Sequence, residues 1–194
     1  MRACHGAEGA EPTVAYGGVE MRLGRRIAAI AVCGLLAIQL AMADAAPAAA
    51  ATLGKADRIL VLKSARLLEL FHGRQLLATF PIALGRHPVG AKHMQGDGRT
   101  PEGIYVIDGR TSDTPYHLAL HISYPDGIDR FVARKAGVEP GGAIYIHGLP
   151  ARFGYNNPKR FYYDWTEGCI AVSNVAIEAI WASVDNGTLI EIRP

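Results

Sequence analysis

The sequence predicts a mostly β domain, with a curved antiparallel sheet or β-sandwich-like arrangement and one or two helices packed outside it. Short apolar runs rich in β-branched and aromatic residues recur along the chain, whereas helical periodicity is rare. The 194 residues, with a net charge of +2, have room for one compact domain and an appended leader. We therefore expect a single folded domain over residues 55–194.

The expected strands are apolar runs separated by polar or glycine-containing breaks. They cover residues 58–63, 66–71, 75–84, 103–108, 116–123, 143–147 and 188–192. A short helix is expected over 126–135. A stronger one, over 175–184, can be capped by Ser173 or Asn174 and ends before the Asn-Gly pair at 186–187. Apolar side chains recur at helical spacing in this second helix, so one of its faces should pack on the sheet: Ile177, Ile180, Trp181 and Val184.

Residues 1–45 are typical of an N-terminal extension followed by a secretory signal peptide. From Met21, three arginines precede an apolar run over 27–42, and small residues follow it. This run is shorter than the roughly 20 residues that span a membrane. We expect cleavage near Ala46, no stable membrane span afterwards, and export to the periplasm or cell envelope. An uncleaved anchor is the alternative, and either Met1 or Met21 can be the true start. An alanine-rich tether over 46–54 follows.

Composition argues against several classes of function. No cluster of Lys and Arg is dense enough to indicate nucleic-acid binding. His117 and His121 are four residues apart, which on a strand separates them by about 13 Å, so they cannot share a metal. No other ligand motif occurs, and we expect neither a metal nor a cofactor.

Cys169 is the candidate nucleophile. Cys4 and Cys33 lie in the predicted leader, so export would leave Cys169 as the one thiol of the mature chain. Gly168 before it allows a tight turn that leaves the thiol accessible. A thiol needs a base within reach, and His147, at the end of an apolar strand, is the best candidate. The alternatives are a buried thiol that packs as a hydrophobic side chain and a core histidine.

Three segments together resemble a known family. They are Ile146-His147-Gly148, Thr166-Glu-Gly-Cys-Ile170 and Gly98-Arg-Thr-Pro-Glu-Gly-Ile-Tyr105. The combination resembles the L,D-transpeptidase (YkuD-like) catalytic domain over residues 58–193. The resemblance implies that fold, with Cys169 as nucleophile, His147 as general base and the carbonyl of Gly148 orienting the imidazole. It also implies an oxyanion hole formed by backbone N–H groups around Gly168 and Cys169.

Two positions depart from the pattern of that family. Many members have His where this chain has Glu167, and Arg where it has Ala171. The missing Arg removes an anchor for a carboxylate or for developing charge, so the substrate can differ. The whole segment 164–174 resembles a proteobacterial subgroup that includes both transpeptidases and an enzyme releasing the outer-membrane lipoprotein from peptidoglycan.

The long segment between His147 and Cys169 is rich in aromatic and basic residues. Loops of this length are usually functional lids or disordered. We take Trp165, Thr166, Arg152 and Arg160 as candidate contacts to a stem peptide, whose carboxylates Arg can bind. Packing on the sheet and a solvated loop face are the alternatives.

The resemblance implies acyl transfer on peptidoglycan stem peptides through a cysteine acyl-enzyme. An acceptor amine would then complete L,D-transpeptidation. If water is the acceptor, the same residues make a hydrolase: an L,D-carboxypeptidase, or an amidase that frees a wall-linked lipoprotein. A non-catalytic peptidoglycan-binding module is a third possibility, which the presence of both Cys169 and His147 weakens. Nothing in the sequence chooses the acceptor.

Overall fold

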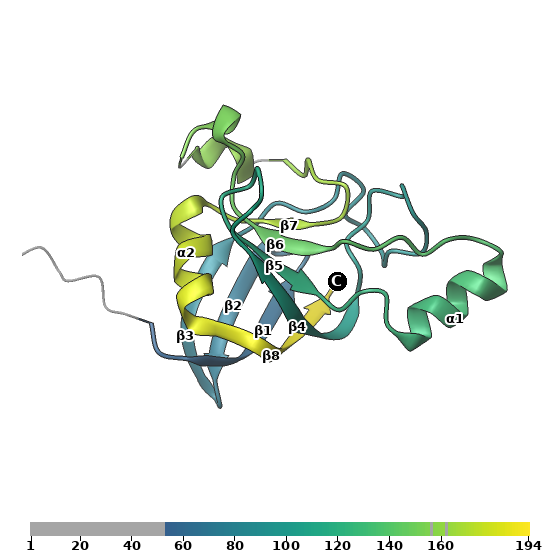
Figure 1. Cartoon of the computed structure of the whole chain (residues 1–194), viewed down its shortest axis with the longest axis horizontal. Helices are drawn as coiled ribbons and strands as arrows, with labels where there is room; N and C mark the ends of the chain where they lie inside the picture. Colours follow the sequence, from purple (N-terminus) through teal and green to yellow (C-terminus); the bar gives the residue numbers. More distant parts are fainter. Residues whose placement is uncertain (1–52, 156, 162) are drawn as a thin grey trace, which may run out of the picture. The chain divides into compact units, whose positions relative to one another are not determined.

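An eight-stranded sheet that curls on itself organises the chain (Figure 1). The computed structural model describes residues 53–155, 157–161 and 163–194, so the predicted leader and tether residues 1–52 lie outside them. The strands are β1 (Ala56–Leu62), β2 (Leu67–His72), β3 (Gln75–Pro81), β4 (Gly103–Thr111), β5 (Ala119–Ile122), β6 (Tyr145–His147), β7 (Ile170–Ala171) and β8 (Val184–Arg193). Their order in the sheet is β3-β2-β1-β8-β4-β5-β6-β7.

The sheet is mixed rather than wholly antiparallel. Strands β1 and β2, β2 and β3, β4 and β8, β4 and β5, and β5 and β6 pair antiparallel. Short connections join β1 to β2, β2 to β3 and β4 to β5. The pairs β1–β8 and β6–β7 are parallel. Each parallel pair needs a long crossover, and the β6–β7 crossover is the aromatic and basic loop between His147 and Cys169. This loop joins the C-terminal end of β6, at His147, to the N-terminal end of β7, next to Cys169.

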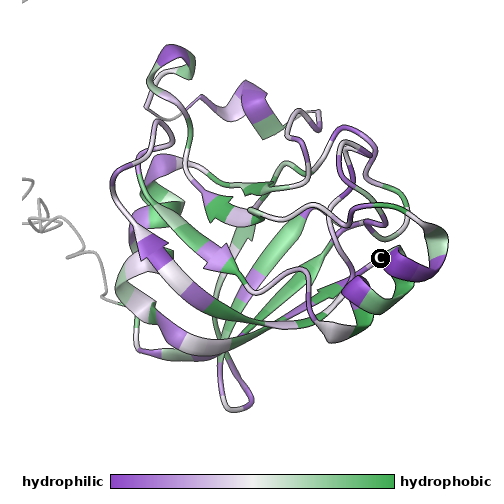
Figure 2. Cartoon of the chain, turned by 45° about the vertical axis from the view of Figure 1, so that its right-hand side comes forward, coloured by the Kyte–Doolittle hydropathy of each residue, from purple (hydrophilic) through white to green (hydrophobic). Residues whose placement is uncertain are grey.

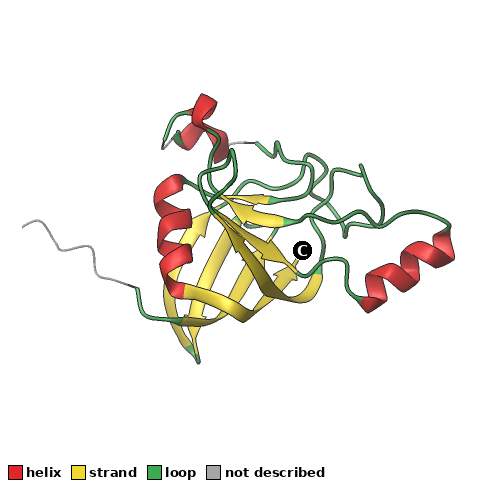
Figure 3. Cartoon of the chain, viewed as in Figure 1, coloured by secondary structure: helices red, strands yellow, loops and turns green. Residues whose placement is uncertain are grey.

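Two helices and two short 3₁₀ turns complete the described part of the chain (Figure 3). They are α1 (Gly127–Ala136), α2 (Asn174–Ser183), η1 (Ala151–Phe153) and η2 (Pro158–Phe161). Ser173 caps α2, and Ile177 and Ile180 are fully buried on its inner face with Trp181 partly buried beside them. Helix α1 buries only Ala133, so α2 alone contributes a full face to the core.

Apolar side chains from almost every strand fill the inside of the curl. Many residues of these strands are coloured as hydrophobic in Figure 2. The fully buried ones include Ile59, Val61, Leu68, Leu70, Ile107, Leu120, Ile146 and Ile170. No helix among the described residues is long and apolar enough to cross a membrane.

Two element boundaries differ from the sequence prediction in ways that shape the site. The strand expected over 75–84 ends at Pro81, and the buried segment 82–84 crosses to β7, where Ala83 and Ala171 exchange backbone hydrogen bonds of 2.9 and 2.8 Å. The Asn-Gly pair expected to follow a helix lies inside β8 instead, because that strand begins at Val184. The first difference brings residues 82–86 beneath the turn that carries Cys169.

Candidate active site

His147 occupies the last position of β6 and is 4% exposed. Its Nδ1 lies 2.7 Å from the carbonyl oxygen of Gly148. A carbonyl accepts only, so Nδ1 carries the proton and Nε2 is left as the basic nitrogen. Gly148 is required here for space, because a Cβ at this position would lie 2.5 Å from Oδ1 of Asn174 and 2.9 Å from the carbonyl of Tyr116.

Burial keeps the imidazole neutral. It lowers the pKa of His147 to about 4, although the hydrogen bond to Gly148 acts in the opposite direction. A neutral imidazole with a fixed tautomer can accept a proton at Nε2 at neutral pH. The cost of charging it must be offset during the reaction by a nearby negative charge.

Cys169 immediately precedes β7 and is partly buried. Because Ile146 pairs with Ile170 and His147 with Ala171, Cys169 comes level with Tyr145, next to the strand that ends in His147. Its Sγ lies 3.6 Å from the carbonyl oxygen of Ala143. Ala143 has a φ of 54°, in the left-handed region that non-glycine residues rarely adopt.

The resting form of Cys169 is the thiol. Burial raises its pKa, against the opposing effects of the backbone N–H of Tyr145 and the positive charge of Lys92. A nucleophilic cysteine often has a depressed pKa. The pKa of Cys169 is not depressed here, because the side chain is partly buried and faces the carbonyl of Ala143. The resting pair is therefore a neutral thiol and a neutral imidazole.

Cys169 and His147 open into the same cavity, of about 520 Å³. The lining residues come from β4, β5, β6 and the loops beside them, and from the turn before β7. They are Thr111, Asp113, Thr114, Tyr116, Ala119, Ala143, Tyr145, His147, Arg152, Trp165, Thr166, Glu167 and Cys169. The cavity is large enough for part of a peptide, and it brings a nucleophile, a base and a cation together.

A tight turn presents the thiol. Thr166 donates its hydroxyl to the carbonyl of Cys169 at 2.7 Å and accepts the N–H of Gly168 at 3.1 Å. Gly168 has a φ of 129°, and a Cβ there would lie 2.5 Å from the carbonyl oxygen of Arg99. The hydroxyl of Thr166 is thus committed to the turn. The N–H of Gly168 is also used, which leaves the N–H of Cys169 as the candidate oxyanion donor of the pair expected from the sequence.

Aromatic rings hold the imidazole on two sides. The ring centroid of Tyr116 lies 4.4 Å from that of His147, and Trp165 lies 5.9 Å away in an edge-on arrangement. Phe153 packs edge-on against Trp165, and the guanidinium of Arg160 lies 3.5 Å above the Phe153 ring. The loop therefore packs against the catalytic histidine candidate.

Both candidate arginines lie over the ring of Phe153, but they differ in their relation to the cavity. Arg152 lines the cavity. Arg160 does not, because its guanidinium covers Phe153 and donates to the hydroxyl of Tyr163. Of the two, only Arg152 is placed to meet a substrate group in the cavity.

The two departures from the family pattern have clear structural consequences. Ala171 is fully buried opposite Ala83, so the position where many members have Arg belongs to the core of this protein. Glu167 is exposed at the rim of the cavity and pairs with Arg86. The rim therefore carries an ion pair where the sequence pattern of other members has an imidazole.

Several cavity residues were not predicted. Thr111 ends β4, Asp113 and Thr114 follow it, and Tyr116 precedes β5. Their sequence contains turn and strand residues with no catalytic pattern, and only the pairing of β4 with β5 and of β5 with β6 brings them to His147.

His117 and His121 lie in separate pairs with carboxylates. His117 pairs with Glu178 at 2.7 Å and His121 with Asp108 at 2.5 Å, each in its own pair. Among the residues that the structure describes, no three His, Cys, Asp or Glu side chains are grouped to hold a metal ion.

Comparisons with known proteins agree with the geometry. The YkuD family model, described as the L,D-transpeptidase catalytic domain, matches residues 56–192. YafK from Escherichia coli (strain K12) is 28% identical over 148 residues, which cover 73% of this chain and 52% of that protein. The helical cell shape determining protein Pgp2 from Campylobacter jejuni aligns with a TM-score of 0.55 at 26% identity, over 73% of this chain and 50% of that one. The chain thus spans about half the length of each of these relatives. Since the family model covers most of the sequence, the chain belongs to the L,D-transpeptidase (YkuD) catalytic-domain family, whose members act on peptidoglycan.

Proposed function

We propose that this protein is a peptidoglycan L,D-transpeptidase that works through an acyl-enzyme on Cys169. The observation that carries the proposal is the shared cavity, in which the thiol and an imidazole of fixed tautomer face the same space. We further propose that the chain is exported and acts in the periplasm or cell envelope on stem peptides of the wall. A role in cell shape follows by analogy with Pgp2.

In the first half-reaction, Nε2 of His147 takes the proton of Cys169 as the sulfur attacks the carbonyl of the diamino acid in a stem peptide. The N–H of Cys169 donates to the oxyanion, where one preorganised donor contributes about 3–4 kcal/mol. The carbon–nitrogen bond then breaks, and the imidazolium gives its proton to the departing amine, D-alanine. A thioester remains on Cys169, and His147 is neutral again.

In the second half-reaction an amine from a neighbouring stem attacks the thioester. His147 accepts the proton of this amine and returns it to the sulfur as the thioester breaks. The product is a crosslink, and the enzyme regains a neutral thiol and imidazole. Neutral resting partners suit this cycle, because both half-reactions start and end without charge separation.

Arg152 and Trp165 are the proposed substrate contacts. Arg152 lines the cavity, where its guanidinium can bind a carboxylate of the stem peptide. It would thereby supply a cation that the buried Ala171 cannot. Thr166 contributes through the turn that holds Cys169, and Arg160 through the packing of Phe153.

Hydrolysis is the second candidate. The exposed Glu167 at the rim and the absence of Arg at residue 171 favour an atypical substrate, including a wall-linked lipoprotein. With water as acceptor, the same thioester would yield a trimmed stem peptide or a released lipoprotein.

Purified protein incubated with tetrapeptide muropeptides, with and without an added acceptor stem, tests these alternatives by mass spectrometry of the products. Transpeptidation predicts crosslinked dimers and free D-alanine. Trimmed stems without crosslinked dimers would indicate an L,D-carboxypeptidase instead of a transpeptidase. Release of a lipoprotein from lipoprotein-linked muropeptides, with no dimers, would indicate the amidase, and no turnover of any of them would contradict acyl transfer.

A further inference from the structure

A buried ion pair lies behind the turn that carries Cys169. Nζ of Lys92 is 2.8 Å from Oδ1 of Asp97, and the two side chains are only 3% and 8% exposed. Both belong to the irregular segment 85–99 between β3 and β4. Taking two charges out of water is costly, so a buried pair is weak evidence of stabilisation by itself. Its contacts indicate what else it does.

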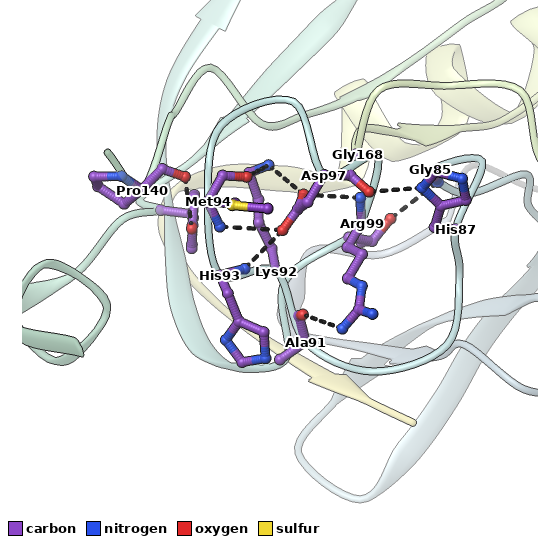
Figure 4. Close-up of polar contacts among 12 residues, drawn as sticks. Gly85, His87, Ala91, Lys92, His93, Met94, Asp97, Arg99, Pro140 and Gly168 are labelled. Atoms are coloured by element: carbon purple, nitrogen blue, oxygen red, sulfur yellow. Dashed lines mark hydrogen bonds and ion pairs between the residues drawn. The ribbon is translucent and has the colours of Figure 1, made fainter. Parts of the chain in front are cut away.

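Asp97 organises this segment (Figure 4). Its Oδ2 accepts the backbone N–H groups of His93 at 2.8 Å and Met94 at 3.1 Å, and its Oδ1 accepts that of Arg99 at 3.0 Å. Burial alone would raise the pKa of Asp97, but these bonds and the one from Lys92 outweigh it and lower the pKa to about 2. A single carboxylate therefore fixes three peptide groups of the segment.

The segment bears directly on the turn before the nucleophile. A Cβ on Gly168 would meet the carbonyl oxygen of Arg99 at 2.5 Å. A Cβ on Gly85 would lie 2.2 Å from the carbonyl oxygen of Gly98 and 3.1 Å from Cα of Gly168. Backbone here touches backbone without intervening side chains. Because Asp97 accepts a hydrogen bond from the N–H of Arg99, it also fixes the backbone against which Gly168 packs.

Lys92 lies on the other side of the thiol, against segment 141–143. Its Cε would be 3.5 Å from a Cβ placed on Gly141, and this segment ends at Ala143, whose carbonyl faces Sγ of Cys169. Its positive charge also favours the thiolate form of Cys169 over the thiol. The pair therefore touches both backbone segments that flank the sulfur.

We propose that Lys92 and Asp97 are positioning residues for Cys169, which hold the backbone behind Gly168 and place a balanced charge near the sulfur. The inference deepens the proposed function and rests on it for the reaction, but neither residue contacts the substrate. If Cys169 must be placed accurately, loss of the pair should affect turnover more than binding, since small misplacements of reacting groups can cost about 10²-fold in rate.

The two members should have opposite effects on the thiol. In Lys92→Met, the cation is lost and Asp97 stays, so alkylation of Cys169 by iodoacetamide should rise only at higher pH than in the wild type. In Asp97→Asn, an unbalanced Lys92 should move the same profile to lower pH. The other titratable and charged groups that line the cavities beside the thiol or the pair are untouched in both variants: His147, Tyr145, Tyr116, Asp113, Arg152, Glu167, Glu139, His93, Tyr124 and Asp129.

The experiment follows Cys169 alkylation by intact mass across pH, together with kcat and KM on tetrapeptide muropeptides and thermal unfolding. Asp185→Asn is the control, because it removes the carboxylate of an exposed pair with Lys55. We expect kcat to fall by about 10²-fold in both pair variants with KM little changed. Lys92→Arg should retain the alkylation profile of the wild type even where Lys92→Met folds poorly.

Unchanged alkylation profiles and unchanged kcat in folded variants would overturn the inference, as would a lower unfolding temperature with neither property altered. Alkylation needs no substrate, so the outcomes separate. Opposite profile shifts without any turnover by the wild type would support the positioning role and refute the proposed function. Normal turnover with unshifted profiles would refute only the positioning role.

Discussion

The imidazole of His147 donates from Nδ1 to the carbonyl oxygen of Gly148, the next residue in the chain, over 2.7 Å. A bond between adjacent residues fixes the tautomer without a carboxylate, so it orients the ring while leaving it uncharged. Burial then keeps the imidazole neutral, since it lowers the pKa of His147 to about 4. Because Nδ1 holds the proton and the ring is neutral, Nε2 is available to accept a proton, and His147 is not part of a resting ion pair.

Replacement of this base tests the role of His147. His147→Gln should reduce turnover by about 10²–10⁴-fold, the usual contribution of general-base assistance. The circular dichroism spectrum should stay that of the wild type, because glutamine preserves polar character at the end of β6. His72→Gln, at an exposed histidine of β2, is the matched control and should retain full activity. Substantial turnover by His147→Gln would rule out the base.

The depressed pKa of His147 also predicts a dependence of stability on pH. Between pH 6.5 and about 4 the unfolded chain binds a proton that the folded protein excludes, so the folded state loses stability as pH falls through this range. The contribution is about 3 kcal/mol when complete. Urea unfolding at pH 7 and pH 4.5 should show a smaller loss for His147→Gln than for the wild type. An equal loss in both would show that His147 is not buried neutral.

Gly168 should be irreplaceable by alanine. Its φ of 129° is unfavourable for other residues, and a Cβ would lie 2.5 Å from the carbonyl of Arg99. Gly168→Ala should lose at least about 1–3 kcal/mol of stability and displace the Cys169 turn, with lower activity at temperatures where it remains folded. Gly127→Ala, where a Cβ meets nothing within 4 Å, is the control. Equal unfolding temperatures for both variants would contradict the described turn.

Replacement of each of the two loop arginines should change KM by a different amount. Arg152→Ala should raise KM for stem peptides, because its side chain lines the cavity. Arg160→Ala removes a guanidinium that lies on Phe153 outside the cavity and should affect KM less. Steady-state kinetics on tetrapeptide muropeptides measures both. A larger rise in KM for Arg160→Ala than for Arg152→Ala would reverse the assignment.

Local patterns in the sequence were enough to predict both described helices and every described strand except the two-residue β7, whereas the pairing of Cys169 with His147 stays a prediction. Each apolar run became a strand within a few residues, and Ser173 caps α2 as its residue type favours. The strand expected over 75–84 ended early because residues 82–84 pair with β7, far along the chain. Such a contact leaves no periodic trace in the sequence.

The site itself was only partly predictable for the same reason. Gly168 and Thr166 were recognised near the thiol, but the hydroxyl of Thr166 closes the turn rather than facing a ligand. Tyr116 and the Lys92–Asp97 pair gave no signal, because their importance depends on packing across separate segments. A lysine and an aspartate five residues apart normally indicate a solvated loop, and only burial distinguishes this pair.

The central claim is that Cys169 forms a thioester with the substrate. Intact-mass spectrometry of the protein quenched during turnover of tetrapeptide muropeptides should detect an adduct with the mass of the muropeptide less D-alanine, mapped to Cys169 by digestion. Cys169→Ala should show no adduct and no turnover, since no other nucleophile of comparable strength lines the described cavity. Consumption of substrate by Cys169→Ala, or turnover by the wild type with no covalent adduct on Cys169 at any quench time, would contradict the mechanism.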